Sequence, residues 1–158
     1  MSLLIRSGRL WRPMVRGWAR VRRGKTLGVR AVVLDTAGRV VLVRHTYVSG
    51  WWLPGGGVDA GETAEQALAH ELEEEAGVRL LARPRLLSIH SNDARFRGDH
   101  VLLYLVDADG WEPCAPTHPQ EIAEIGWFDP RSLPSDLAAG TRARLREALE
   151  GAAPDPAW

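Results

Sequence analysis

The sequence predicts a mixed α/β (α+β) fold, built as a sandwich around a mixed β-sheet. Short apolar segments typical of strands are interspersed with segments in which apolar residues recur at helical spacing. These segments do not alternate regularly between strand and helix, which argues against a parallel sheet made of βαβ units. With 158 residues, 45% of them hydrophobic and 25% charged, the chain has the size and composition of one globular domain.

The strand and helix segments follow one another along most of the chain. Strands at residues 27–35 and 40–44 flank a turn, and we expect them to form an antiparallel pair. Beyond the central helix, the expected elements are strands at 85–91, 100–106 and 122–128 and a helix at 138–149. Residues 108–120 contain three prolines and are expected to form a loop, whereas residues 151–158 are expected to fray.

We therefore divide the chain into a basic segment at residues 1–26, a folded domain at 27–150 and a flexible tail at 151–158. Residues 1–30 hold nine of the 20 basic residues and no acidic residue, so the remainder carries 11 basic against 20 acidic residues, a net charge of −9. The basic segment has the pattern of an amphipathic helix, suited to a membrane surface or an anionic ligand, or to packing on its own domain or a second subunit. A homodimer is therefore one expectation.

The cysteine count and the hydropathy favour one compartment. Cys114 is the only cysteine, so no intrachain disulfide can form, which fits a reducing environment. No stretch approaches the roughly 20 apolar residues of a membrane span, and the N-terminus lacks the apolar core of a secretory signal. We expect a cytoplasmic protein without a transmembrane segment.

The most informative stretch of the sequence, residues 55–78, reads GGGVDAGETAEQALAHELEEEAGV. Thr63 and Gln66 form a capping box that begins a helix, and Gly77 is placed to end it.

One side of this helix is densely acidic, because Glu71, Glu74 and Glu75 are spaced i, i+3 and i+4. Like charges on adjacent turns repel, and a bound cation would relieve that repulsion. Clustered carboxylate oxygens suit Mg²⁺ or Mn²⁺.

This stretch resembles the Nudix box, G-x5-E-x7-R-E-U-x-E-E-x-G-U, in which U is aliphatic. The matching positions are Gly56, Glu62, Glu71, Leu72, Glu74, Glu75, Gly77 and Val78. His70 stands where the family carries arginine. The resemblance implies a Nudix-like α/β/α sandwich, a divalent metal ion and hydrolysis of a small-molecule nucleotide. Family members are often dimers.

The resemblance also implies roles for the acidic residues. The metal ligands would be Glu71, Glu74 and Glu75 together with the carbonyl of Gly56, and Glu62 would support the box. The general base would be Glu71 or a carboxylate on a later loop. The later candidates are Glu121, Glu124 and Asp99, of which we favour Glu121.

His70 changes the chemistry expected of the box. Arginine is always charged and can hold a glutamate by a forked pair. Histidine is shorter, and its ordinary pKa is about 6.5. His70 can still reach Glu74 at i+4. Normal activity, a shifted pH response and a weakened enzyme are all open, and we hypothesise a working but pH-sensitive site.

Substrate contacts must come from the glycine loop and from other segments. Gly55 and Gly57 allow the backbone to approach phosphate oxygens closely. The aromatic candidates for stacking a base are Trp51, Trp52, Tyr47 and Phe96. The candidates for holding phosphates are Arg30, Arg44, Arg95 and Arg97.

Three functions fit these observations. The first is a metal-dependent pyrophosphohydrolase that cleaves a nucleoside diphosphate linked to another moiety, such as ADP-ribose, a nucleotide sugar or a nucleoside triphosphate. The second is an RNA 5′-pyrophosphohydrolase that uses the basic segment, although no stable nucleic-acid partner is expected. The third is a non-catalytic nucleotide sensor, suggested only by His70.

Overall fold

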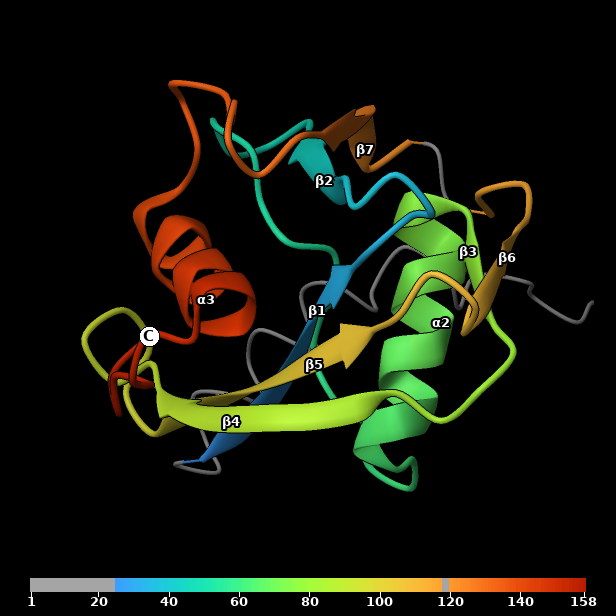
Figure 1. The fold of residues 1–158 in the computed structure, drawn as a ribbon. Coiled ribbons are helices and arrows are strands. Elements are labelled where there is room, and N and C mark those ends of the chain that lie inside the picture. The colour runs from blue at the N-terminus through green and yellow to red at the C-terminus, as the bar shows by residue number, and fades with distance from the viewer. Residues whose placement is uncertain (1–24, 118–119) are drawn as a thin grey trace, which may run out of the picture.

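The computed structural model describes residues 25–117 and 120–158 (Figure 1). The expected amphipathic helix lies outside the described residues. The elements are β1 (Thr26–Val33), β2 (Val40–His45), α2 (Ala64–Ala76), β3 (Val78–Leu80), β4 (Arg85–Ser91), β5 (Asp99–Val106), β6 (Trp111–Pro113), β7 (Ile122–Phe128) and α3 (Ala139–Glu150). Within the described residues, no helix is long and apolar enough to cross a membrane.

The strands pair with partners that are distant in sequence. β5 lies between β1, to which it is parallel, and β4, to which it is antiparallel. β2 pairs antiparallel with β7, and β3 with β6. The mixed sheet is therefore confirmed, but the expected antiparallel pair of β1 and β2 is wrong. The two strands share only the bridge between Leu34 and Val40, because each is buried against a different long-range partner.

The two helices cover opposite sides of the β1–β5 region (Figure 1), which confirms the expected α/β/α sandwich. On the α2 side, Leu68 and Leu72 pack with Val29 in one hydrophobic cluster. On the α3 side, Leu145 packs with Val32 in a second cluster. The sandwich places the acidic helix and the last helix on separate cores, and β1, β2 and β5 contribute side chains to both.

Two short segments differ from the sequence-based expectation. Residues 111–113, expected to lie in a loop, form β6, and Pro113 is tolerated because it ends this short strand opposite Val78. The tail at 151–158, expected to fray, packs against the end of β4. Ser91 N donates to Pro156 O at 2.7 Å, and Trp158 N donates to Ser91 O at 2.8 Å.

Candidate active site

Helix α2 positions the acidic residues. The Thr63 side chain accepts from Gln66 N, and the Gln66 side chain accepts from Thr63 N, so the predicted capping box is confirmed. Gly77 ends the helix in the left-handed conformation at φ 64°. Leu68 and Leu72 are fully buried, and Glu75 is buried with them on a neighbouring arc of α2, so the carboxylates face the glycine loop at the edge of the buried side.

The glycine loop runs directly against β1 and against the acidic side of α2. Gly55 has φ 140°, and a side chain there would collide with the carbonyl of Val29. A side chain at Gly56 would collide with the carboxylate of Glu71, so that carboxylate lies against the loop backbone. Gly56 O accepts from Val29 N at 2.8 Å. Only glycine permits this close approach of backbone and carboxylate.

Glu75 reaches the same loop from the next turn of α2. Its Oε2 accepts from Gly55 N at 3.0 Å, and its side chain is largely buried, which the sequence pattern did not indicate. Burial raises the pKa of Glu75 to about 7, and the charges of Glu71 and Glu121 add to this, against the lowering effects of Arg30 and the Gly55 N–H. Glu71 and Glu75 therefore converge on adjacent backbone groups of one loop.

His45, at the end of β2, lies behind Glu75. Its Nδ1 is 3.8 Å from Glu75 Oε1. Burial lowers the pKa of His45 to about 4, and the charge of Arg30 acts in the same direction. The contact is therefore that of a neutral imidazole with a carboxyl group, and the distance is too long for a hydrogen bond.

Arg30, expected to hold substrate phosphate, is used by the loop itself. Its Nη1 donates to Leu53 O at 3.2 Å and to Gly55 O. Its charge also lowers the pKa of Glu75 against the effect of burial. Arg30 therefore braces the loop carbonyls and supplies positive charge beside the acidic residues.

Glu62 and His70 form a pair at the start of the box. Glu62 Oε1 accepts from Asp59 N at 2.6 Å, and Glu62 Oε2 lies 3.4 Å from His70 Nδ1. The spacing allowed His70 to reach Glu74, and the structure places its ring beside Glu62. His70 thus holds a box glutamate at a single point, where an arginine could make a forked pair.

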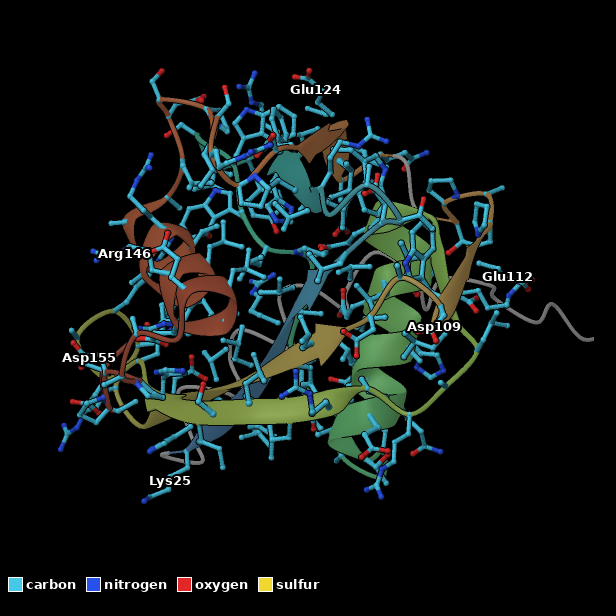
Figure 2. The ribbon with its side chains drawn as sticks, in the orientation of Figure 1. Lys25, Asp109, Glu112, Glu124, Arg146 and Asp155 are labelled. Carbon is cyan, nitrogen blue, oxygen red and sulfur yellow. The ribbon has the colours of Figure 1, made fainter. Side chains whose placement is uncertain are left out.

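The structure separates the three later candidates for the general base. The charge of Glu121 acts on Glu75, which places it near the acidic cluster. Glu124 pairs with Arg44 at 3.2 Å and points outward at the surface (Figure 2). Asp99 is bound by Thr26 and by Asn92, whose Nδ2 donates at 2.8 Å, at the start of β5. Of the three, Glu121 is the one whose charge raises the pKa of Glu75.

The donor set suits a hard divalent cation. Glu71 and Glu75 offer carboxylate oxygens at one loop, and Glu74 lies on the same side of α2. In residues 25–117 and 120–158, no three His, Cys, Asp or Glu side chains are already gathered as a metal site. Glu75 is instead turned to the Gly55 N–H, so the residues fit a cation in chemistry but not yet in arrangement.

Beside the loop, Trp51 and Trp52, both candidates for stacking on a base, differ in burial. Trp51, proposed to stack on a base, is 4% exposed and packs edge-on against Phe128 at 4.8 Å. Trp52 is partly buried against the α2 cluster and lines a pocket of about 820 Å³. The backbone N–H and C=O of Trp52 pair with Val43. Because side chains alternate along an extended strand, Trp51 then points to the other side, into the α3 core.

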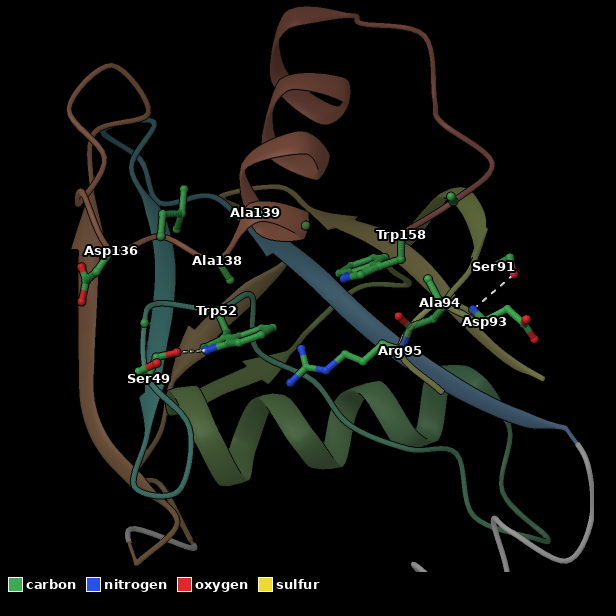
Figure 3. Close-up of a pocket in the computed structure, with 15 residues that line it drawn as sticks. Ser49, Trp52, Ser91, Asp93, Ala94, Arg95, Asp136, Ala138, Ala139 and Trp158 are labelled. Atoms are coloured by element: carbon green, nitrogen blue, oxygen red, sulfur yellow. Dashed lines mark hydrogen bonds between the residues drawn. The ribbon is translucent and has the colours of Figure 1, made fainter. Parts of the chain in front are cut away.

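Arg44 and Arg95, two of the expected phosphate-binding arginines, have different surroundings. Arg44 is held by Glu124 and by Asp136 at 2.9 Å, and its guanidinium lies 4.7 Å over the Trp51 ring. Arg95 is exposed and lies 4.9 Å over the Trp52 ring, where it lines the pocket (Figure 3). Arg95 therefore remains a candidate for substrate contact, whereas Arg44 serves the fold.

Comparison with known proteins identifies the family of this chain. The profile of the NUDIX domain matches residues 24–150. The chain belongs to the NUDIX family. It is 29% identical over 129 residues to a MutT-like protein of Streptomyces ambofaciens, covering 82% of this chain and 80% of the relative. A MutT NUDIX hydrolase from Burkholderia pseudomallei superimposes with a TM-score of 0.65 at 30% identity, covering 77% of this chain and 96% of that chain.

A third relative matches a shorter part of the chain. An RNA pyrophosphohydrolase of Erythrobacter litoralis is 33% identical over 101 residues, covering 53% of this chain and 62% of the relative. The family match and these relatives identify the chain as a Nudix hydrolase.

Several residues around the site were not predicted from the sequence. His45 carried no signal, because a histidine at a strand end has no fixed role. Asp136 and Trp158 contact the pocket only because distant segments meet there. A tryptophan in a proline-rich tail was a usable signal of burial, and the expectation of fraying overlooked it.

Proposed function

We propose that this Nudix hydrolase is a divalent-metal-dependent pyrophosphohydrolase that cleaves the diphosphate of a nucleoside diphosphate linked to another moiety. The observation that carries the proposal is the convergence of Glu71 and Glu75 on the backbone of Gly55 and Gly56. Carboxylates and close backbone groups at one point suit a substrate whose reacting atom is surrounded by anionic oxygens.

The residues that would hold Mg²⁺ or Mn²⁺ are Glu71, Glu74 and Glu75, with the Gly56 carbonyl as a further ligand. Bound there, the cation would neutralise phosphate charge and acidify a water molecule. The chain itself supplies position and charge: the glycine loop admits the diphosphate, and Arg30 holds the loop. Glu71 or Glu121 would remove the proton from the attacking water.

The test is turnover of a substrate panel with Mg²⁺ or Mn²⁺. The panel contains ADP-ribose, UDP-glucose, the nucleoside triphosphates and a 5′-triphosphorylated RNA. We expect metal-dependent release of nucleotide or phosphate that falls on the order of 100-fold or more in Glu75→Gln. Glu73→Gln is the matched control, because Glu73 lies on the same helix but pairs with Arg79 at 3.2 Å. Turnover that survives Glu75→Gln, or needs no metal, would reject the proposal.

The relative named as an RNA pyrophosphohydrolase supports a second candidate, removal of pyrophosphate from RNA 5′ ends. This function predicts salt-sensitive RNA binding that disappears when residues 1–25 are deleted. RNA turnover that is no slower than turnover of the small nucleotides, and that requires this segment, would favour it.

A further inference from the structure

The segment that follows α3 supplies one wall of the pocket beside the glycine loop. Ala157 and Trp158 line the pocket together with Trp52 and Arg95. Figure 3 shows Trp158 on one side and the pair of Trp52 and Arg95 on the other. This segment lies beyond residue 150, where the family match ends. The Trp158 wall is therefore a feature of this chain that the family match does not assign.

A buried polar network fixes the position of this wall. Arg144 Nη1 donates to Ala157 O at 2.8 Å, and Nη2 donates to Glu147 Oε1 at 2.6 Å. The same Nη1 lies 2.9 Å from His90 Nδ1. Arg144 and His90 are fully buried beside the largely buried side chain of Glu147. Burying a charge is costly unless it is paired, so the contacts of Arg144 with Glu147 and Ala157 favour one position of this segment.

The ring of Trp158 is held by the same groups. Arg144 lies 5.4 Å over it, and His90 meets it edge-on at 5.6 Å. The ring also rests on Gly140 in the first turn of α3, where an added methyl group would lie 2.6 Å from Trp158 Nε1. The ring is thus fixed by packing from α3 and β4 while it lines the pocket.

We propose that Trp158 is a specificity-determining residue that stacks on a planar ring of the substrate, the nucleobase, with Trp52 and Arg95 as the facing wall. This inference rests on the proposed function. Aromatic and guanidinium faces stack on any base. A pocket of about 820 Å³ lies within the range of small-molecule sites.

The position of the pocket fits this role. Trp52 precedes Gly55 by three residues, which span at most roughly 11 Å, so the pocket adjoins the loop proposed to admit the diphosphate. The pocket also offers polar groups for the edge of a ring, from Asn92, Asp93 and the first turn of α3. No side chain among the described residues caps that turn at Ala138.

The test compares a substrate that has a ring with one that lacks it. For Trp158→Ala, we expect KM for a nucleoside triphosphate to rise roughly 5- to 100-fold, with kcat changed less than about threefold. KM for inorganic tripolyphosphate should stay within about twofold. Trp158→Phe keeps an aromatic face and should restore most of the lost affinity. An equal rise for both substrates, or no rise at all, would overturn the inference.

Gly140→Ala separates stacking from stability. The added methyl group must displace the Trp158 ring, whereas alanine is the better helix former. Helix propensity and the loss of ring packing act in opposite directions on the unfolding midpoint, so we expect the midpoint to change little while KM for the nucleoside triphosphate increases. An unchanged KM contradicts a role for the ring in substrate stacking.

Binding keeps this inference distinguishable from the proposed function. If no panel compound turns over, the proposed function fails, and calorimetric titration with ADP, GDP and inorganic pyrophosphate then decides the inference. Weaker binding of ADP or GDP to Trp158→Ala, with pyrophosphate unchanged, supports stacking. Equal binding to both proteins, or no nucleotide binding to the wild type, overturns it.

Discussion

The glycine loop with α2 and the pocket beside it are adjacent, but they are built in opposite ways. The first comes from one continuous stretch, residues 55–77, in which the spacing of glycines and glutamates determines what meets. The second is assembled from residues 49, 50, 52, 91–95, 136–140 and 157–158. The proposed reacting end of this hydrolase is therefore local in sequence, whereas the proposed base-stacking pocket is a product of the tertiary fold.

The adjacent tryptophans give the strongest test of this difference. Trp51→Ala removes a fully packed ring from the α3 core and should lower the free energy of unfolding by about 3–5 kcal/mol. Trp52→Ala, at the half-buried pocket wall, should cost only about 1 kcal/mol but weaken nucleotide binding. Urea unfolding and KM measurements on both variants check this. Similar stability losses in the two variants would mean that the division between core and pocket is wrong.

The next effect concerns the network that holds the pocket wall. Arg144→Met leaves Glu147 buried without its cation, so we expect a loss of about 3 kcal/mol in unfolding free energy. The matched control is Arg146→Met, two residues along α3, where an exposed pair with Glu150 at 3.5 Å should contribute less than about 1 kcal/mol. Equal effects in urea unfolding would show that the buried network does not hold the tail.

On the loop side, Glu75→Gln should stabilise the metal-free protein while it abolishes activity. The folded-state pKa is raised from 4.5 to about 7, so the ionised group destabilises the fold. The stability that protonated Glu75 contributes is therefore fully present below about pH 4.5 and is lost as the pH rises through about 7. In EDTA, the gain from Glu75→Gln should be absent near pH 4.5 and reach at most about 3 kcal/mol at pH 8.

Thermal melts across this pH range measure that gain. Glu73→Gln, on the same helix at a residue paired with Arg79, is the control that tests whether the gain is specific to Glu75. A gain that is constant with pH would mean that Glu75 is not the group whose ionisation opposes folding.

The smallest expected effect is at His70. His70→Arg would replace a single contact with Glu62, now 3.4 Å, by a forked and permanently charged pair. We expect a rise of a few-fold in kcat at pH 8 and a flatter rate profile between pH 6 and 8. The hypothesis of a pH-sensitive site fails if both the rate and its pH profile are unchanged in this variant.

Much of the glycine loop and α2 could be predicted because local contacts determine their structure. The capping box at Thr63, the left-handed Gly77 and the buried leucines all follow from contacts within one helical turn. Strands β4 and β7 have the bounds that their apolar patterns predicted. What local rules could not show is that Glu75 lies under the loop, because its burial depends on β1 and β2 packing above it.

The rest could not be read from the sequence because pairing and side-chain direction are settled at long range. β1 and β2 looked like a hairpin, yet each found a partner more than 60 residues away. Alternation allowed either tryptophan to face outward, and only the bridge from Trp52 to Val43 decides between them. The sequence alone allowed Arg44 to bind substrate, whereas the fold pairs it with Glu124 and Asp136.

The division of β1 between two hydrophobic clusters has a consequence for how this protein can change. Val29 and Val33 face the α2 cluster, whereas Val32 faces the α3 cluster. Substitutions on the two sides of β1 share few neighbours, so their effects on the free energy of unfolding should be close to additive. Improved packing under α3 can therefore compensate for the instability of a crowded acidic site without altering its geometry. Directed evolution of new substrate preferences would start best from a variant stabilised in that way.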